Sequence, residues 1–324
     1  MIISRTPLRV SFVGGGTDLF GFCTKERGAV VSTSIQKYVY IVVHSSFDRK
    51  NKIVYSAIED TNNVDEIQNL RVREAMKMTG ITKGVEIHSI AEVPAGTGMG
   101  SSSSFTVGLL NALYAYQGKH VSAEKLAREA SEIEINILKE PIGMQDQYAA
   151  AFGGINKIEF FGNETKIRPI IIGKNEKSQL EKNLMLFHLG GIMDASKILS
   201  RQNKNLEDPN IFNMHLQMRN LADEMEKHLT ENDITHFGEL LNKNWLLKKQ
   251  LASGISNENI EKIYEKAISA GAIGGKVLGA GGRGFILFYV NPEKQNAVRN
   301  ALYDLDLVEL KFDNSGSKII YVGE

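Results

Sequence analysis

The sequence is poor in cysteine and has no excess of charge of either sign. Cys23 is the single cysteine among 324 residues, which excludes an internal disulfide and a zinc site built from clustered cysteines. Basic and acidic residues balance at 38 each, and no long run of like charge occurs. No apolar stretch is long enough to span a bilayer. These absences argue against a protein that binds nucleic acid or an anionic membrane surface.

A signal-peptide shape is also missing, because residues 1–7 lead directly into a strand-like pattern, and we expect a cytoplasmic protein. The seven histidines show no metal-ligand spacing. The length and the apolar fraction of 42% suit two domains, or one large domain, with a sizeable core. The polar stretch 175–183 is the candidate boundary region. We expect a first domain over residues 1–178 and a second over residues 179–324.

The most informative segment is a run rich in glycine and serine, residues 94–104, with the sequence PAGTGMGSSSS. The preceding residues 85–90 have a strand pattern, and Phe105, Leu109 and Leu113 follow at helical spacing. A glycine loop between a strand and a helix N-terminus offers backbone N–H groups to an anion, most often phosphate. The serine hydroxyls can cap the helix, bind phosphate or reach a metal ion. A flexible surface loop is the alternative, which this position disfavours.

Two familiar phosphate loops do not match. Residues 271–277 approach a Walker A loop but are one residue short, and Val277 has no hydroxyl for magnesium. Gly14, Gly15 and Gly16 follow a strand-like run, as in dinucleotide-binding proteins. However, an acidic residue comes immediately, and no helix pattern opens there. A dinucleotide-binding oxidoreductase therefore remains a weak alternative.

Strands and helices are mixed along the chain without a regular βαβ period, which predicts an α+β fold. Alternating and β-branched patterns predict a hairpin from 153–161 and 167–172, and strands over 8–13, 28–34, 38–45, 53–56, 85–90, 184–189, 285–290 and 319–322. Helical spacing predicts helices over 64–78, 105–113, 123–139, 213–231, 234–249, 257–270 and 293–302. Ser122 is expected to cap the helix that begins at residue 123.

Three glycine-bearing segments, taken in order, resemble the GHMP kinases, a family that includes galactokinase, homoserine kinase, mevalonate kinase and phosphomevalonate kinase. They are residues 7–19 (PLRVSFVGGGTDL), 96–104 and 276–285 (KVLGAGGRGF). The resemblance spans nearly the whole chain. It implies an ATP-dependent kinase with an α+β fold of two domains and the active site between them. The first domain would be like domain 2 of ribosomal protein S5 and the second ferredoxin-like.

The resemblance also implies roles for individual residues. Residues 143–147 resemble the Gly-x-x-Asp-Gln segment of the sugar kinases, so Asp146 would be the catalytic base, with Arg9 beside it. Mg²⁺ would be bound by Glu134 and Ser102, or by Ser101 in place of Ser102. The ATP phosphates would be held by Pro94, Gly96, Thr97, Gly98, Met99, Gly100, Ser101, Ser102 and Ser103. The substrate would be bound by Gly15, Gly16, Thr17, Asp18, Gly281, Gly282 and Arg283.

Each of these residue types also has an ordinary structural role. Glu134 is alternatively an exposed helix acid, Asp146 a helix cap and Asp18 a turn residue. Arg9 is alternatively part of a structural ion pair. Lys276 is expected either to contact phosphate or to be solvated. Trp245, the single tryptophan, is expected to pack in the core or between the domains, with a stacking platform for sugar as the alternative.

Within the family, the Gly-Gly-Gly-Thr-Asp run at 14–18 resembles the bacterial heptose 7-phosphate kinases and fucokinase-like enzymes. This implies transfer to the anomeric C1 hydroxyl of D-glycero-D-manno-heptose 7-phosphate, giving the 1,7-bisphosphate for nucleotide-activated heptose and surface polysaccharide. The partner would be this small molecule, and the chain a monomer or homodimer. Two departures stand out: Arg283 replaces a usual glycine, and 189–194 lack an arginine common in the subgroup. The rivals are a fucose-, galactose- or mevalonate-type kinase and an inactive regulator that binds ATP and sugar.

Overall fold

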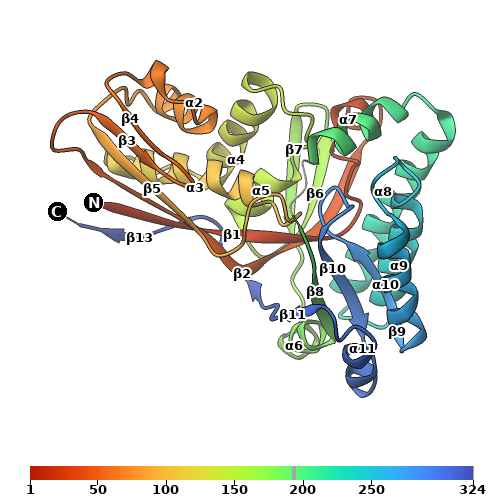
Figure 1. The fold of residues 1–324 in the computed structure, drawn as a ribbon. Helices are drawn as coiled ribbons and strands as arrows, with labels where there is room; N and C mark the ends of the chain where they lie inside the picture. Colours follow the sequence, from red (N-terminus) through yellow and green to blue (C-terminus); the bar gives the residue numbers. More distant parts are fainter. Residues whose placement is uncertain (192–194, 324) are drawn as a thin grey trace.

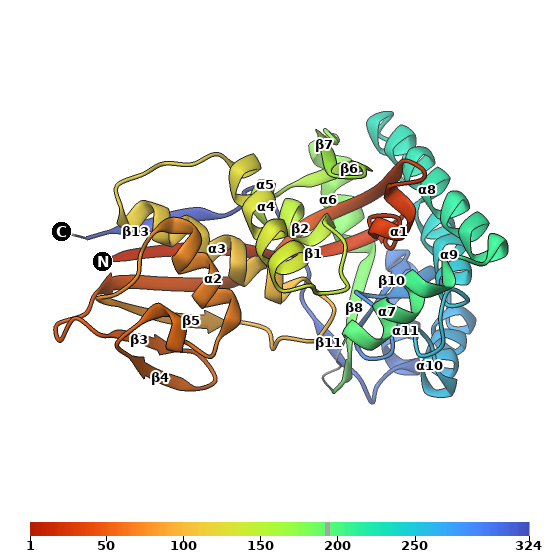
Figure 2. The same cartoon turned by 90° about the horizontal axis from the view of Figure 1, so that it is seen from above.

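The computed structural model of the protein describes residues 1–191 and 195–323, and it contains two β-sheets with helices packed on them (Figure 1). The larger sheet has nine strands, in the order β13-β1-β2-β5-β3-β4, with β6 and β12 also paired with β2 and β7 paired with β6. The smaller sheet has the order β11-β8-β10-β9. The predicted α+β class is confirmed. Both chain ends lie at the same end of the molecule (Figure 2), where the Gly323 N–H donates to Met1 O.

The larger sheet is built on two long antiparallel strands, β1 (Ile2–Val13) and β2 (Gly28–Ser45). The sequence predicted two separate strands where β2 is one. The register shifts from Pro7 opposite Tyr38 to Leu8 opposite Ile35, so the interruption of the pattern is a bulge and not a strand end. The other strands of this sheet are β3 (Asn51–Val54), β4 (Ile58–Thr61), β5 (Val85–Ala91), β6 (Ile155–Phe161), β7 (Glu164–Pro169), β12 (Phe312–Asp313) and β13 (Lys318–Val322).

Helices cover one face of this sheet (Figure 1). They are α1 (Phe20–Cys23), α2 (Leu70–Thr79), α3 (Ser101–Tyr116), α4 (Ala123–Ser131) and α5 (Gln145–Phe152). The helix predicted over 64–78 is wrong at its start, because a 3₁₀ turn (Val64–Glu66) precedes α2 and Asn69 caps α2. Ser122 caps α4 as predicted, accepting from the Lys125 N–H. The chain then continues as a π-helical turn, Glu132–Ile137.

The smaller sheet consists of β8 (Leu184–Gly190), β9 (Ala272–Val277), β10 (Gly284–Val290) and β11 (Asp306–Val308). Its central strands are buried on both faces. Leu186 and Leu287 belong to the core shared with the larger sheet, whereas Phe187 and Phe288 belong to a second core with Trp245. Because successive side chains point to opposite faces, a strand covered on both sides is a continuous apolar run. The predicted packing role of Trp245 is confirmed.

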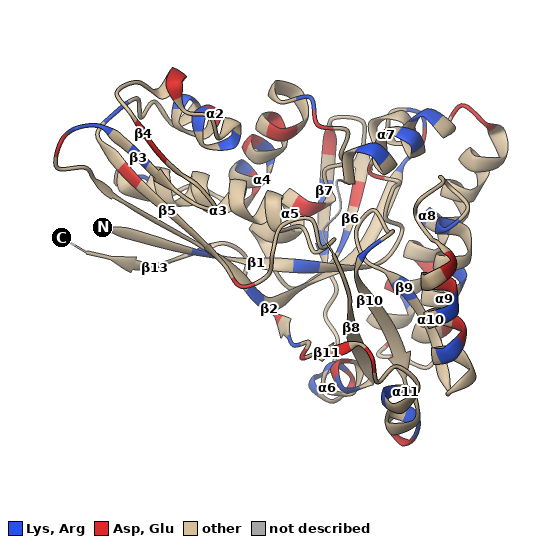
Figure 3. Ribbon diagram, in the orientation of Figure 1, with Lys and Arg blue, Asp and Glu red and all other residues tan. Residues whose placement is uncertain are grey.

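The remaining helices belong to the second part of the chain, and not all of them pack on the smaller sheet (Figure 1). They are α6 (Lys174–Asn183), α7 (Ala195–Asn205), α8 (Pro209–Thr230), α9 (Phe237–Lys248), α10 (Glu258–Ser269) and α11 (Gln295–Ala301), with a 3₁₀ turn at Pro292–Lys294. Helix α7 was not predicted. The polar stretch proposed as a boundary region is helix α6, so the predicted division between residues 178 and 179 falls inside a helix and stays a prediction. Basic and acidic residues are both present on helices such as α6 and α10 (Figure 3).

The two parts of the chain meet through two glycine loops. Gly98 has φ +86°, and a Cβ there would lie 2.6 Å from Leu278 O. Gly279 has φ +63°, and its Cβ would lie 2.4 Å from Gly98 Cα. These positions need glycine both for their backbone conformation and for the close approach. None of the described helices combines the length and the apolar character needed to cross a membrane.

Replacing Gly98 by alanine tests this contact. Gly98→Ala adds both left-handed strain and a clash with Leu278 O, whereas Gly118→Ala (φ +72°) adds strain without a neighbour within 4 Å. We expect Gly118→Ala to cost about 1 kcal/mol in the free energy of unfolding and Gly98→Ala about 1–3 kcal/mol more. Urea denaturation measures both. Equal losses of unfolding free energy in the two variants would contradict the clash expected from this close approach of the loops.

Candidate active site

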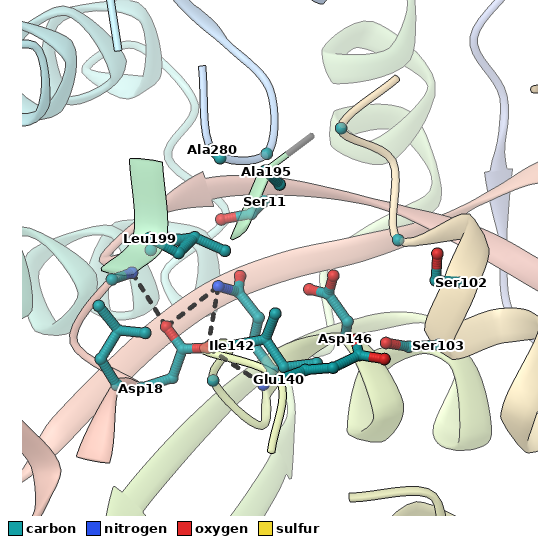
Figure 4. A pocket seen from close by; sticks show the side chains of 18 of the residues that line it. Ser11, Asp18, Ser102, Ser103, Glu140, Ile142, Asp146, Ala195, Leu199 and Ala280 are labelled. Atoms are coloured by element: carbon teal, nitrogen blue, oxygen red, sulfur yellow. Dashed lines mark hydrogen bonds between the residues drawn. The ribbon is translucent and has the colours of Figure 1, made fainter. Parts of the chain in front are cut away.

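One cavity lies where the two glycine loops meet, and it is lined from both parts of the chain. The end of β1, the glycine loop before α3 and the start of α5 contribute from the first part. Helix α7, the last residue of α9 and the Gly279–Ala280 turn contribute from the second. In Figure 4, Asp146 is drawn between Asp18 on one side and Ser102 and Ser103 on the other. The predicted site residues therefore meet in one place, although several take positions that the sequence did not indicate.

Arg9 and Asp146 form a bidentate ion pair at the centre of this cavity. Arg9 Nε donates to Asp146 Oδ1 at 2.7 Å, and Nη2 donates to Oδ2 at 2.6 Å. The remaining Nη1 donates to Gly98 O at 2.6 Å, so one guanidinium joins β1, the glycine loop and α5. Among the described residues, no side chain caps α5, so Asp146 is not the helix cap weighed above. Two parallel charge-assisted bonds hold the carboxylate in a fixed orientation.

The predicted phosphate loop divides into two sets of residues. Gly96, Gly98, Gly100 and the serines 101–103 line the cavity, and Gly100 is the N-cap of α3. The helix N-terminus therefore faces the cavity with its unpaired N–H groups and positive dipole end. The structure places the other three predicted loop residues away from the lining: Pro94 is exposed, and Thr97 and Met99 are buried.

Glu134 is fully buried, so the alternative of an exposed helix acid is wrong. Its carboxylate accepts hydrogen bonds from Ser103 Oγ at 2.8 Å, Thr106 Oγ1 at 2.7 Å and Arg71 Nε at 3.2 Å. Gln147 donates a further hydrogen bond. The serine that contacts Glu134 is therefore Ser103, whereas Ser102 is exposed at the cavity. Glu134 lies in the π-helical turn, a distortion often found at functional sites.

Arg71 and Glu140 extend this group to the cavity wall. The Arg71 guanidinium pairs with Glu134 and, at 2.6 Å, with Glu140, and both Arg71 and Glu140 line the cavity. Burial raises the pKa of Glu140, against the lowering effect of Arg71. Two carboxylates therefore share one guanidinium, which leaves surplus negative charge here.

Asp18 is buried at the other end of the cavity. It accepts from the Gly16 N–H at 2.9 Å, from Gln145 Nε2 at 3.1 Å and from the Gln145 N–H at 3.3 Å. The bond to Gly16 is the predicted turn contact, and the same carboxylate also lines the cavity. Burial, and then the charge of Asp146, raise the pKa of Asp18. A Cβ at Gly143 would lie 2.0 Å from Asp18 Oδ2, which explains the glycine of the Gly-x-x-Asp-Gln segment.

Several residues predicted to bind substrate lie outside the cavity lining. Thr17 is buried, and its hydroxyl donates to Gly14 O at 2.8 Å. The Gly282 N–H donates to Ile255 O, and Gly281 also packs against Ile255. Arg283 is exposed beside Gly191. Of the predicted substrate residues, the structure brings Gly15, Gly16 and Asp18 to the cavity.

Both expectations for Lys276 are wrong, because its side chain is neither solvated nor at the cavity. Lys276 is buried in β9, where Nζ donates to Ser11 O at 2.6 Å and Phe12 O at 3.0 Å. These bonds tie the smaller sheet to β1. Burial lowers the pKa of Lys276 well below its ordinary value.

Among the described residues, seven polar ones that line the cavity were not predicted from the sequence: Ser11, Arg71, Glu140, Gln145, Ser196, Gln202 and Lys248. Gln145 lies inside a quoted motif and could have been found there, but the others depend on tertiary contacts. Ser11 Oγ and Gln145 Oε1 are buried without a hydrogen-bond partner in the described part of the chain. Lys248 Nζ donates to Gly279 O. Burial and the charge of Arg9 lower the pKa of Lys248 to about 8, although Asp18 and Asp146 raise it.

Family models match both parts of the chain. The model described as "GHMP kinases N terminal domain" matches residues 66–154, and "GHMP kinases C terminal" matches residues 221–305. The chain is also 31% identical to the D-glycero-alpha-D-manno-heptose 7-phosphate kinase of Campylobacter jejuni, over 93% of each chain. The chain belongs to the GHMP kinase family. The predicted membership of this family and the predicted two-domain α+β fold are thereby confirmed.

Other relatives agree with this assignment. This GHMP kinase is 25% identical to the mevalonate kinase of Pyrococcus horikoshii, over 92% of this chain and 83% of the relative. The crystal structure of a D-glycero-D-manno-heptose 1-phosphate kinase from Bacteroides thetaiotaomicron has TM-score 0.82 at 22% identity and covers 100% of both chains. A putative sugar kinase from Campylobacter jejuni has TM-score 0.76 at 26% identity, over 98% of this chain and 97% of that chain.

Family membership makes this protein an ATP-dependent phosphotransferase with an alcohol group as acceptor, as predicted. GHMP kinases use ATP as the phosphoryl donor. The oxidoreductase alternative, which depended on Gly14, Gly15 and Gly16, is wrong, because the chain belongs to the GHMP kinase family.

The raised pKa of Asp18 gives the unfolding free energy a defined pH dependence. The folded protein binds the Asp18 proton more tightly than the unfolded chain, so this stabilisation is present at low pH and is lost as pH rises above 3.8. Asp18→Asn removes the buried charge. We expect the variant to gain stability relative to the wild type between acid and neutral pH, in urea titrations.

Asp223→Asn is the matched control with the opposite sign. Burial alone would raise the pKa of Asp223, but hydrogen bonds from Arg27 and Lys157 lower it. Its stabilising contribution is therefore present at neutral pH and is lost in acid, so this variant should lose stability relative to the wild type as pH rises. A difference between Asp18→Asn and wild type that stays constant with pH would contradict the assigned pKa shift.

Proposed function

We propose that this GHMP kinase transfers the γ-phosphoryl group of ATP to the anomeric C1 hydroxyl of D-glycero-D-manno-heptose 7-phosphate. The observation that carries the proposal is the Arg9–Asp146 pair, held between Asp18 and the glycine loop in one cavity. The heptose assignment is supported by the Campylobacter jejuni relative, which matches over 93% of each chain. The 1,7-bisphosphate product would supply nucleotide-activated heptose for surface polysaccharide, in the cytoplasm.

The acceptor side of the cavity suits a ligand with several hydroxyl groups. Asp18 offers two carboxylate oxygens, and Ser11 Oγ and Gln145 Oε1 have no partner within the described residues. Both atoms lie close to Gly15, since a Cβ there would be 3.2 Å from Ser11 Oγ and 3.8 Å from Gln145 Oε1. Buried polar atoms without partners cost free energy, which a hydroxylated ligand recovers. A sugar provides more such groups than a mevalonate-type acceptor.

The transfer itself needs positioning, charge neutralisation and a destination for one proton. The acceptor oxygen forms a bond to the γ-phosphorus, the bond to the β,γ-bridging oxygen breaks, and ADP leaves with that electron pair. Asp146 accepts the hydroxyl proton. Arg9 holds Asp146 in a fixed orientation through two hydrogen bonds and faces the transferring group with positive charge. The backbone N–H groups of the glycine loop and the N-terminus of α3 hold the ATP phosphates.

The hydroxyl and carboxylate oxygens beside the glycine loop are suitable ligands for the Mg²⁺ ion that a kinase of this type requires. Ser103 and Glu134 are in contact, Ser102 faces the cavity, and Glu134 and Glu140 share the single charge of Arg71. Hydroxyl and carboxylate oxygens are the ligands that Mg²⁺ prefers, and the surplus negative charge favours a cation. When bound, Mg²⁺ neutralises the ATP phosphates. Ser102, Ser103 and Glu134 are the residues proposed to hold it.

The regulatory alternative is disfavoured because the chain retains Asp146, Arg9, Glu134 and the serines of the glycine loop. The oligomeric state, monomer or homodimer, stays a prediction.

An acceptor panel tests the proposed activity. We expect ADP release with Mg-ATP and heptose 7-phosphate, and phosphorus NMR should show an anomeric phosphate. The panel also holds mannose 6-phosphate, fucose, galactose, mannose and mevalonate. Asp146→Asn should lower kcat by about 10² to 10⁴-fold while ATP binding persists, because the proton acceptor is lost.

The outcomes of the panel separate the parts of the proposal. Turnover of an unphosphorylated sugar alone would overturn the 7-phosphate assignment and keep the Asp146 mechanism. Near-normal turnover by Asp146→Asn would overturn the base assignment.

Arg283→Ala, which alters an exposed side chain near Gly191, should raise KM for the phosphorylated acceptor if Arg283 binds its phosphate.

Glu134→Gln tests the metal site. Removing the carboxylate charge should raise the Mg²⁺ concentration needed for half-maximal activity by about tenfold or more, because a neutral amide is a weaker ligand for a hard cation. Glu159→Gln is the control, since Glu159 is also buried and paired with Arg27, away from the cavity. An unchanged Mg²⁺ dependence in Glu134→Gln would remove Glu134 from the metal site.

A further inference from the structure

We infer that Lys248 is a further catalytic residue of this kinase, whose ammonium group binds the oxygen atoms of the phosphoryl group during transfer. This inference rests on the proposed phosphoryl transfer at this cavity, but not on the identity of the acceptor. It assigns to the second part of the chain a cation that complements Arg9 from the first. The argument uses the position of Lys248, its contacts and the charges around it.

The backbone of Lys248 is held firmly at the edge of the cavity. Lys248 is the last residue of α9, and Asn244 lies one turn earlier on the same face. Asn244 Oδ1 accepts from the Gly14 N–H at 2.9 Å, which fixes the helix end against the end of β1. Trp245, between them, is fully buried in the second core. The ammonium position is therefore set by the packing of α9.

The ammonium group lies at the junction of the two glycine loops. Lys248 Nζ donates to Gly279 O, and Gly279 packs on the backbone of Gly98. Gly98 O in turn accepts from Arg9, which holds Asp146. A continuous series of contacts thus links Lys248 to the proposed base. Lys248, Gly279, Gly98, Arg9 and Asp146 all line the same cavity.

Lys248 has hydrogen-bonding capacity and charge left over. Its exposed fraction is 4%, yet it makes no ion pair within the described residues. An ammonium group has three N–H donors, and the carbonyl of Gly279 is its partner for one. The neighbouring carboxylates are already bound, Asp146 by Arg9 and Asp18 by Gln145. A buried charge without a counter-ion is costly unless a ligand supplies one.

Charged groups from several elements face Lys248: Arg9 on β1, Asp18 after β1, Asp146 on α5 and Lys276 on β9. Burial lowers the pKa of Lys276 well below its ordinary value, so the cations that carry the argument are Arg9 and Lys248. The two carboxylates already accept hydrogen bonds within the fold, which leaves Lys248 without a counter-ion of its own. Preorganised positive charge acts most strongly where negative charge passes in a transition state. The phosphoryl group that is transferred from ATP to the acceptor oxygen carries negative charge on its oxygen atoms. Lys248 stabilises this charge and does not donate a proton to it.

The test compares Lys248→Met, Lys248→Arg and Lys249→Met, with the acceptor that the wild type uses fastest. Lys249 is the matched control, because it is adjacent but pairs with Glu261 at 2.7 Å away from the cavity. We expect Lys248→Met to lower kcat about 100-fold while the Kd for a fluorescent ATP analogue and the circular dichroism spectrum stay unchanged. Lys249→Met should keep the wild-type kcat.

A pH profile separates charge from structure. Lys248 loses its charge as pH rises through a pKa of about 8, so wild-type kcat/KM should fall on the alkaline side. Lys248→Arg keeps its charge at these pH values, so it should retain measurable activity and lose this alkaline decline.

Three results would overturn the inference. They are wild-type kcat in Lys248→Met, an alkaline decline that persists in an active Lys248→Arg, and loss of folding or ATP binding in both variants. A wild type that uses another sugar would overturn the heptose assignment alone, because the Lys248 comparison then proceeds with that sugar. A wild type that phosphorylates no acceptor would overturn the proposed function together with this inference.

Discussion

The three-way contact of the Arg9 guanidinium is the interaction on which the site depends. It joins a strand, a glycine loop and a helix that are far apart in the sequence, by two bonds to Asp146 and one to Gly98 O. The buried position of Arg9 keeps water from competing for these bonds. A phosphoryl-transfer enzyme gains most from groups that are already placed before the substrate arrives. The fold supplies this placement by ending β1 beside the two loops.

Buried charge is concentrated at this junction, and it carries a cost. Asp18, Glu134, Lys248 and Lys276 are all removed from water, and each needs partners to remain there. Glu134 has four donors and Lys276 has two carbonyls, so both are satisfied within the fold. Asp18 and Lys248, by contrast, face the cavity with shifted pKa values. Buried charges that face a cavity in this way lower the stability of the fold unless a ligand pairs with them.

Much of the cavity lining and the fold class was predictable from short motifs, because positions where another part of the chain approaches closely require glycine. Gly98 and Gly143 occupy such positions. Together with Asp146 they led to the predictions of a phosphate loop and a catalytic base. Polar residues are less informative, because their role depends on burial. The sequence predicts that Glu134 holds Mg²⁺ with Ser102 but not its hydrogen bond from Ser103, and Lys276, predicted at phosphate or in solvent, supports β1. Helix α7 was missed, although its residues face the cavity.

The sequence by itself determined the family, the α+β class and the order of the three glycine segments, since these depend on local conformation and on residues that few alternatives can replace. Only the tertiary structure decided which side chains share the cavity. Lys248 and Ser11 are unremarkable in a linear chain, and they become neighbours of Asp146 only when the smaller sheet and α9 pack against β1. Periodicity reports which residues avoid water, whereas a site is made by polar residues that long-range packing forces to share one buried space.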